Sequence, residues 1–197
     1  MPRQPSMESL EGKFLIAMPG MGDHRFEKTV IFLCAHNAEG AMGFVVNRRL
    51  EQPTMAGFLT QLSIVNADEA KGLPPQLARE PMRSGGPVEP GRGFVLHSPD
   101  FRAASTLQVT GEVCLTATLE ILRAIATGKG PRKSLLVLGY SGWAGGQLES
   151  EIAANGWLTS QSDAGVIFET PDEGKYRRAL GLLGVDPRLL SAESGRA

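Results

Sequence analysis

The residues best suited to chemistry gather in one stretch, residues 139–149, where Ser141 stands between Tyr140 and Gly142. An apolar run at 135–138 precedes it and helical spacing at 148–154 follows it, so the pattern predicts a strand, a glycine turn and a helix. Unpaired N–H groups collect at helix N-termini, and glycines let other atoms approach the backbone. The sequence therefore predicts a binding surface at this turn.

Ser141 invites comparison with the serine of a nucleophile elbow. That motif requires glycine two residues after the serine, and Trp143 stands there. In that architecture the triad histidine follows the serine, whereas the last histidine of this chain is His97. We therefore assign no catalytic residue and favour a protein that is not an enzyme.

The three histidines and two cysteines do not form a local metal-binding motif. No pair has the H-x-x-x-H or C-x-x-C spacing of a zinc chelate, so we expect no metal and no cofactor. One enzymatic alternative stays open, in which His36 or His97 acts as acid or base and Asn47 positions the substrate.

The charges of the chain are nearly balanced, with 20 basic and 21 acidic residues and a formal net charge of −1. A global field that would draw the chain to nucleic acid is therefore absent. Three short basic clusters remain, namely Arg48-Arg49, Lys129 with Arg132-Lys133, and Lys175 with Arg177-Arg178. We interpret them as solvated ends of elements and expect no nucleic-acid partner.

Compartment and membrane association follow from the apolar residues. No run approaches the roughly 20 apolar residues of a membrane span, so we expect no membrane partner. Cys34 and Cys114 lie in apolar contexts, which predicts buried thiols and a reducing, cytoplasmic compartment.

The elements that must position these residues alternate between strands and helices. Strands are predicted at 13–18, 29–35, 42–47, 93–97, 107–115, 134–140 and 166–168, with a hairpin turn at 37–40 and a turn or bulge at 110–112. Helices are predicted at 54–62, 117–127 with a Thr116 cap, 145–154, and 171–183 behind a Thr170–Glu173 capping box. Residues 67–90 hold several prolines and glycines and are predicted to be a long loop.

This order predicts an α+β domain with a mixed, largely antiparallel sheet and packed helices. We expect a single domain at residues 11–190, with flexible tails at 1–10 and 191–197.

Several short motifs resemble those of the YqgE/AlgH family of uncharacterised bacterial proteins over residues 12–168. They are Leu15-Ile16-Ala17-Met18-Pro19, His36 with Gly40-Ala41-Met42-Gly43, Val46-Asn47, Gly85-Gly86-Pro87-Val88, Leu96-His97, and Gly139-Tyr140 with Gly142-Trp143 and Gly146-Gln147-Leu148-Glu149. The resemblance implies a bent, partly barrel-like sheet and a cytoplasmic bacterial protein, and it implies no reaction. Some members carry a transcriptional-regulator label, but this chain contains no recognisable helix-turn-helix.

The functional hypothesis is a non-enzymatic regulatory or binding domain for an unknown small molecule or protein. Its candidate surface comprises His36, Asn47, Gly85, Gly86, Pro87, His97, Tyr140, Gly142, Trp143 and Gln147. We expect the two glycine-rich segments to line one concave surface, and replacement of Gly142 or Gly146 by valine to damage folding or binding. The alternatives are the histidine enzyme above and a regulator that binds nucleic acid.

Overall fold

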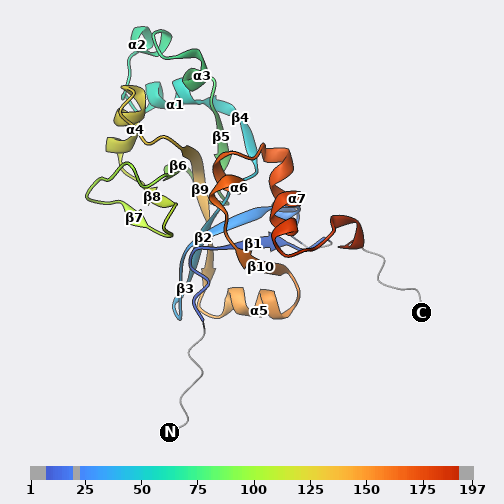
Figure 1. Cartoon of the computed structure of the whole chain (residues 1–197). Helices are drawn as coiled ribbons and strands as arrows, with labels where there is room; N and C mark the ends of the chain where they lie inside the picture. The colour runs from blue at the N-terminus through green and yellow to red at the C-terminus, as the bar shows by residue number, and fades with distance from the viewer. Residues whose placement is uncertain (1–7, 20–22, 191–197) are drawn as a thin grey trace, which may run out of the picture.

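The computed structural model describes residues 8–19 and 23–190 (Figure 1). The strands are β1 (Lys13–Ala17), β2 (Val30–Asn37), β3 (Gly40–Val45), β4 (Arg49–Thr54), β5 (Pro81–Ser84), β6 (Val88–His97), β7 (Leu107–Gln108), β8 (Cys114–Thr116), β9 (Ser134–Ala144) and β10 (Trp157–Gln161). The helices are α1 (Met55–Gln61), α2 (Ala67–Lys71), α3 (Pro75–Ala78), α4 (Leu119–Ala126), α5 (Gln147–Ala153), α6 (Ala164–Phe168) and α7 (Asp172–Leu182). Two 3-10 turns are His24–Phe26 and Pro187–Leu190.

The strands form one curled sheet, a half-barrel, in the order β10-β1-β2-β3-β9-β6-β8-β7, with β5 beside β9 and β4 beside β5. In the described chain β5 runs parallel to β9, and the other strand pairs are antiparallel. Figure 1 shows α1 to α4 gathered at one end of the molecule and α5 at the other. The fold is α+β, as the sequence predicted.

Strand β9 joins the two halves of the sheet. Along its first half it lies between β5 and β6, because Val137 and Leu138 pair with residues of both strands. Further along, its residues 141–144 pair with β3. The link from β5 to β6 must therefore pass over β9 near Gly139, where β3 takes the place of β5.

Apolar side chains pack in three clusters around this sheet. The largest is built from the inner sheet face with α6 and α7, and includes Phe14, Phe32 and Phe44. A second lies between the sheet and helices α1 to α4, around Phe58. The third contains both tryptophans and Leu148 of α5. Each end of the half-barrel thus has its own core.

Local turn and helix predictions were largely correct. The hairpin between β2 and β3 turns at Ala38-Glu39, and Gly40 has φ +150°. Helices α1, α4, α5 and α7 lie within two residues of the predicted bounds, and Asn155 with φ +59° lies just after α5. Cys34 and Cys114 are free and buried.

The prediction that the strand ends at Tyr140 and is followed directly by a glycine turn was wrong. Strand β9 continues through Ser141 and Trp143 to Ala144, and only Gly145 and Gly146 form the turn into α5. The strand continues because β3 supplies backbone partners for residues 141–144. Gly142 is therefore an exposed strand residue, not part of a helix-capping loop.

The predicted strand at 166–168 was also wrong. These residues belong to α6, whose N-terminus is capped by the Asp163 carboxylate, while β10 lies earlier in the chain. The capping box at the start of α7 does not form, because the Thr170 hydroxyl donates to the Gly165 carbonyl and Pro171 occupies the cap position. The Thr170 hydroxyl thus bonds to a nearby backbone carbonyl instead of capping the helix.

Two further boundaries differ from the sequence prediction. The proposed loop at 67–90 contains α2, α3 and β5, each no longer than five residues, so the prolines limit element length without preventing elements. Thr116 is a buried residue of β8, and Thr118 is the N-cap of α4. Among the described residues, no helix combines the length and apolar character that crossing a membrane requires.

Candidate functional site

The two glycine-rich segments lie against each other, because the β5–β6 link crosses β9 with backbone in contact with backbone. A Cβ atom on Gly86 would lie 2.3 Å from the Tyr140 carbonyl carbon and oxygen, and one on Gly139 would lie 2.7 Å from the Gly86 oxygen. The Ser141 hydroxyl donates to the Gly85 carbonyl at 3.1 Å and is buried. This close crossing explains the glycines without a ligand.

Gly142 does not share that constraint. A Cβ atom there would meet only the Tyr140 ring, at an ordinary 3.5 Å. The structure thus shows no close neighbour for a Cβ atom at Gly142, and the effect of Gly142→Val on folding or binding stays a prediction, whereas Gly146, with φ +78°, has a backbone conformation that favours glycine. Tyr140 is half-buried and packs edge-on against Phe94, with ring centroids 5.9 Å apart.

His36 connects three segments at the far end of β2. The Leu10 N–H donates to its Nδ1 at 2.9 Å, so the neutral ring carries its proton on Nε2 and donates to Glu149 Oε1 at 2.6 Å. This hydrogen bond holds the pKa of Glu149 below its usual range. His36 is buried and serves as a tie between the segment before β1, strand β2 and helix α5.

Trp143 and Gln147 converge on Glu151. The indole N–H groups of Trp143 and Trp157 donate to the same Glu151 oxygen, Oε2, at 2.9 and 2.7 Å. The Gln147 amide donates to Oε1 at 3.1 Å and accepts from the Ala144 N–H at 3.0 Å. These groups hold α5 on the sheet.

His97 is fully buried at the end of β6. Its Nδ1 donates to the Ser98 carbonyl at 2.7 Å, and its Nε2 accepts from the Thr116 hydroxyl at 2.8 Å. Burial lowers the pKa of His97, which favours this neutral form. Both ring nitrogens are thus occupied within the fold.

The structure does not bring His36 and His97 together. His97 pairs with Ser134 at the start of β9. His36 contacts α5, and Trp143, which lies beside α5, is near the end of β9. At roughly 3.3 Å per residue, these two places on the strand are about 30 Å apart. A single acid–base site with both histidines is incompatible with this geometry.

Asn47 lies at the edge of a hollow that we call the Asn47 cavity. Its side chain accepts from the Val30 N–H and donates to the Lys28 carbonyl, both at 3.0 Å. Lys28, with φ +52°, is thereby held two residues before β2 begins. The cavity has a volume of about 500 Å³ and is lined by Lys28, Asn47, Arg49, Asp172, Glu173, Tyr176 and Arg177.

A second hollow, the Pro87 cavity, flanks the same stretch of chain. Its volume is about 350 Å³, and its lining comprises Arg25, Phe26, Val45, Arg48, Ser84, Gly86, Pro87 and Pro90. Asn47 and Arg49 line the Asn47 cavity, and Arg48, between them in the sequence, lines the Pro87 cavity. Of the predicted site residues, Asn47 lines the first hollow, and Gly86 and Pro87 line the second.

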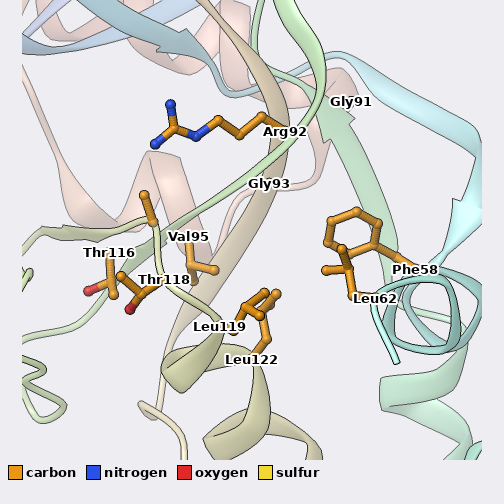
Figure 2. A pocket seen from close by; sticks show the side chains of 11 residues that line it. Phe58, Leu62, Gly91, Arg92, Gly93, Val95, Thr116, Thr118, Leu119 and Leu122 are labelled. Atoms are coloured by element: carbon orange, nitrogen blue, oxygen red, sulfur yellow. The ribbon is translucent and has the colours of Figure 1, made fainter. Parts of the chain in front are cut away.

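A third hollow is small and largely apolar (Figure 2). It encloses about 170 Å³ between α1, β6 and the start of α4. Figure 2 shows Phe58 and Leu62 on one side and Leu119 and Leu122 on the other, with the Arg92 guanidinium turned away from them. That guanidinium lies 5.0 Å from the centre of the Phe94 ring.

A buried charge network underlies the Asn47 cavity. Arg83 donates to both carboxylate oxygens of Asp172, at 3.3 and 3.2 Å, and Lys175 Nζ lies 3.0 Å from Asp172 Oδ1 and 2.9 Å from the Val46 carbonyl. Burial raises the pKa of Asp172, but the Arg83 hydrogen bonds and the Lys175 charge outweigh it and the net shift is downward. Arg83 also pairs with Glu80 at 3.1 Å.

Sequence reasoning missed most of this cavity. It noted Arg48-Arg49 and Lys175 with Arg177 as basic clusters but assigned all of them to solvated ends, whereas Lys175 is only 1 % exposed. Lysine one turn after an aspartate on a helix was the available sign of an internal ion pair. Arg83, 89 residues from Asp172 in the sequence, had no such local sign.

Comparisons with known proteins are consistent across the whole chain. Residues 14–188 match the family model described as AlgH-like. A UPF0301 protein of Methylobacterium nodulans is 53% identical over 195 residues, covering 98% of this chain and 93% of the relative. A UPF0301 protein of Rhizobium meliloti is 51% identical over 188 residues, covering 95% of this chain and 93% of the relative.

Two solved structures share the architecture. The solution structure of the AlgH protein from Pseudomonas aeruginosa is 41% identical, with a TM-score of 0.78 and full coverage of both chains. A crystal structure of a Corynebacterium diphtheriae protein has a TM-score of 0.67 at 17% identity, and covers 100% of this chain and 95% of that one. The second likeness concerns the fold alone.

Proposed function

This chain belongs to the AlgH-like family, and from that premise we propose that it is a non-enzymatic binding protein whose small-molecule ligand occupies the Asn47 cavity. The observation that carries the proposal is the volume of about 500 Å³ lined mostly by polar side chains. Cavities of this size accommodate small ligands, and a few placed polar groups give them specificity. Asn47, a residue of the family resemblance, holds one wall in place.

The state of the candidate catalytic groups supports binding without catalysis. Both ring nitrogens of His36 and of His97 are bonded within the fold, and the Ser141 hydroxyl is committed to the Gly85 carbonyl. A general base needs a ring nitrogen within hydrogen-bond reach of its substrate. None of these three residues lines the Asn47 cavity.

The free, buried thiols of Cys34 and Cys114 support a reducing compartment, and we assign the protein to the cytoplasm. A protein that binds a ligand without converting it has an effect that depends on whether the ligand is bound. A regulatory role is part of this proposal, with the bound small molecule as the input.

The proposal is tested by a thermal-shift screen of a metabolite library with the full chain. A ligand that binds only the folded protein raises its midpoint temperature. Glu173→Trp places a large side chain in the cavity lining and is expected to abolish the shift. Glu120→Trp is the matched control, because Glu120 is also an exposed acid in the first turn of a helix, α4.

A ligand whose shift survives Glu173→Trp and disappears in a variant of another surface would overturn this assignment. Chemical conversion of a ligand during incubation would revive the enzymatic alternative. Direct mapping of amide chemical shifts to Lys28, Asn47 and Tyr176 would locate the bound ligand in the cavity.

A further inference from the structure

We propose that the ligand of the Asn47 cavity is a small phosphorylated molecule, held through its phosphate by Lys28 and Arg49 with Arg177 nearby. This inference rests on the proposed function and names the chemical class of the ligand. It starts from the charged groups that line the cavity. Three of the seven lining residues are cations, and two, Asp172 and Glu173, are acids.

The acid Asp172 does not neutralise these cations. Its carboxylate is already bound by the Arg83 guanidinium and the Lys175 ammonium beneath the cavity. Counting the whole cluster with Glu80, five cationic side chains stand against three carboxylates. The cavity therefore has an excess of positive charge, although the whole chain is nearly neutral.

The cations at the surface are available to a ligand. Lys28 and Arg49 are exposed, and neither side chain makes a hydrogen bond or ion pair with the described part of the chain. Arg177 is also exposed and makes no such close contact there, although its charge acts on Asp186. Ammonium and guanidinium groups are donors without an acceptor, so they require a ligand rich in acceptor oxygens.

The backbone on either side of these cations is fixed before any ligand arrives. The Asn47 side chain is hydrogen-bonded to the Lys28 carbonyl and the Val30 N–H. The backbone of Arg49 is the antiparallel strand partner of Arg83, in β4 and β5. On the opposite wall, the Tyr176 hydroxyl donates to the Ala17 carbonyl at 2.7 Å, which fastens α7 to β1. Preorganised positions of this kind reduce the ordering that binding requires.

A phosphate monoester matches these features better than a monocarboxylate. It carries nearly two negative charges at neutral pH and three acceptor oxygens, enough for an ammonium and a guanidinium together. A volume of about 500 Å³ leaves room for an organic part beside the phosphate. Glu173, the remaining carboxylate, can accept hydrogen bonds from hydroxyl groups of that organic part.

The test is titration calorimetry of the full chain with inorganic phosphate, glucose 6-phosphate, glucose and succinate. We expect glucose 6-phosphate to bind more tightly than inorganic phosphate, and glucose and succinate to bind at least about tenfold more weakly than glucose 6-phosphate, about 1.4 kcal/mol. Amide shifts induced by inorganic phosphate should map to residues 28, 49 and 177.

Variants that remove one charge each distinguish an effect on phosphate binding from an effect on folding. Arg49→Gln and Lys28→Gln are each expected to weaken phosphate binding about tenfold, and Glu173→Gln to strengthen it by removing a like charge. Lys129→Gln is the control, because Lys129 is an exposed lysine outside the cavity lining. Unfolding midpoints of all four variants should stay near that of the parent protein.

Two results would overturn the phosphate assignment. One is binding of inorganic phosphate that Arg49→Gln and Lys28→Gln leave unchanged. The other is a preference for succinate or glucose over glucose 6-phosphate. An uncharged ligand whose binding is blocked by Glu173→Trp would keep the proposed function and refute only this inference, whereas binding elsewhere refutes both.

Discussion

His36 Nε2 and Glu149 Oε1 lie 2.6 Å apart and tie the end of β2 to α5 across 113 residues of sequence. We predict that Glu149→Gln lowers the free energy of unfolding by about 1–2 kcal/mol at pH 7, since hydrogen bonds to a charged group contribute this much. The measurement is urea unfolding, with Glu120→Gln at the exposed Glu120 of α4 as the control.

The same contact predicts an acid dependence of stability. The folded-state pKa of Glu149 is lowered from its usual 4.5 by the His36 hydrogen bond. The contribution is therefore fully present above the unfolded-state value and is lost as the pH falls through the folded-state value. Glu149→Gln should flatten this part of the stability curve below about pH 5, and a curve parallel to that of the parent would refute the assignment.

Glu151 is expected to be the more sensitive acid of α5. Both tryptophan rings are buried, and Glu151→Ala would leave two indole N–H groups without their acceptor. We predict a loss of about 2–4 kcal/mol, with a smaller loss for Glu151→Gln, which retains an acceptor oxygen. Chemical unfolding followed by tryptophan emission measures it, and equal stability of Glu151→Ala and Ser150→Ala would contradict the prediction.

Asp172→Asn should destabilise the protein by about 3–5 kcal/mol, because it removes the charge shared by two largely buried cations. Lys175→Met should cost less, since Asp172 keeps both hydrogen bonds from Arg83. Urea unfolding of the two variants at pH 7 checks the order. If Lys175→Met is instead the more destabilising variant, the hydrogen bond from Lys175 to the Val46 carbonyl contributes more to stability than the charge of Asp172 does.

The strand crossing predicts opposite outcomes for two glycines of β9. Gly139 has φ +73° and no room for a Cβ atom, so Gly139→Ala should cost about 2–4 kcal/mol. Gly142→Ala should change stability by no more than about 0.5 kcal/mol. Thermal unfolding compares the two. Ser141→Ala should also be mild, because the Gly85 carbonyl still accepts from the Val45 N–H at 2.8 Å.

Features encoded by neighbouring residues could be predicted from the sequence. The hairpin after Asn37 and the helix ends at Gly128 and Asn155 depend on residues with positive φ at defined places. The α+β class follows from their order. These predictions required no knowledge of distant partners.

Features that depend on distant partners could not be predicted. The extension of β9 past Gly139 requires β3, and the position of Thr116 requires His97. The Asn47 cavity combines residues near 28, 48 and 175, and its charge balance depends on Arg83. Periodicity within a segment contains no information on such pairs.

The pairing of β1 with β10, and of β3 with β9, also determines the order in which the chain can fold during synthesis. Strands β1 to β3 are synthesised first, and β1 pairs with β10 and β3 with β9 only after residues 134–161 have followed. Closing such long loops is slow, and unpaired edges can associate with other chains in the meantime. The nascent segment that contains β1 to β3, residues 13–45, therefore depends on protection until these later strands have been made.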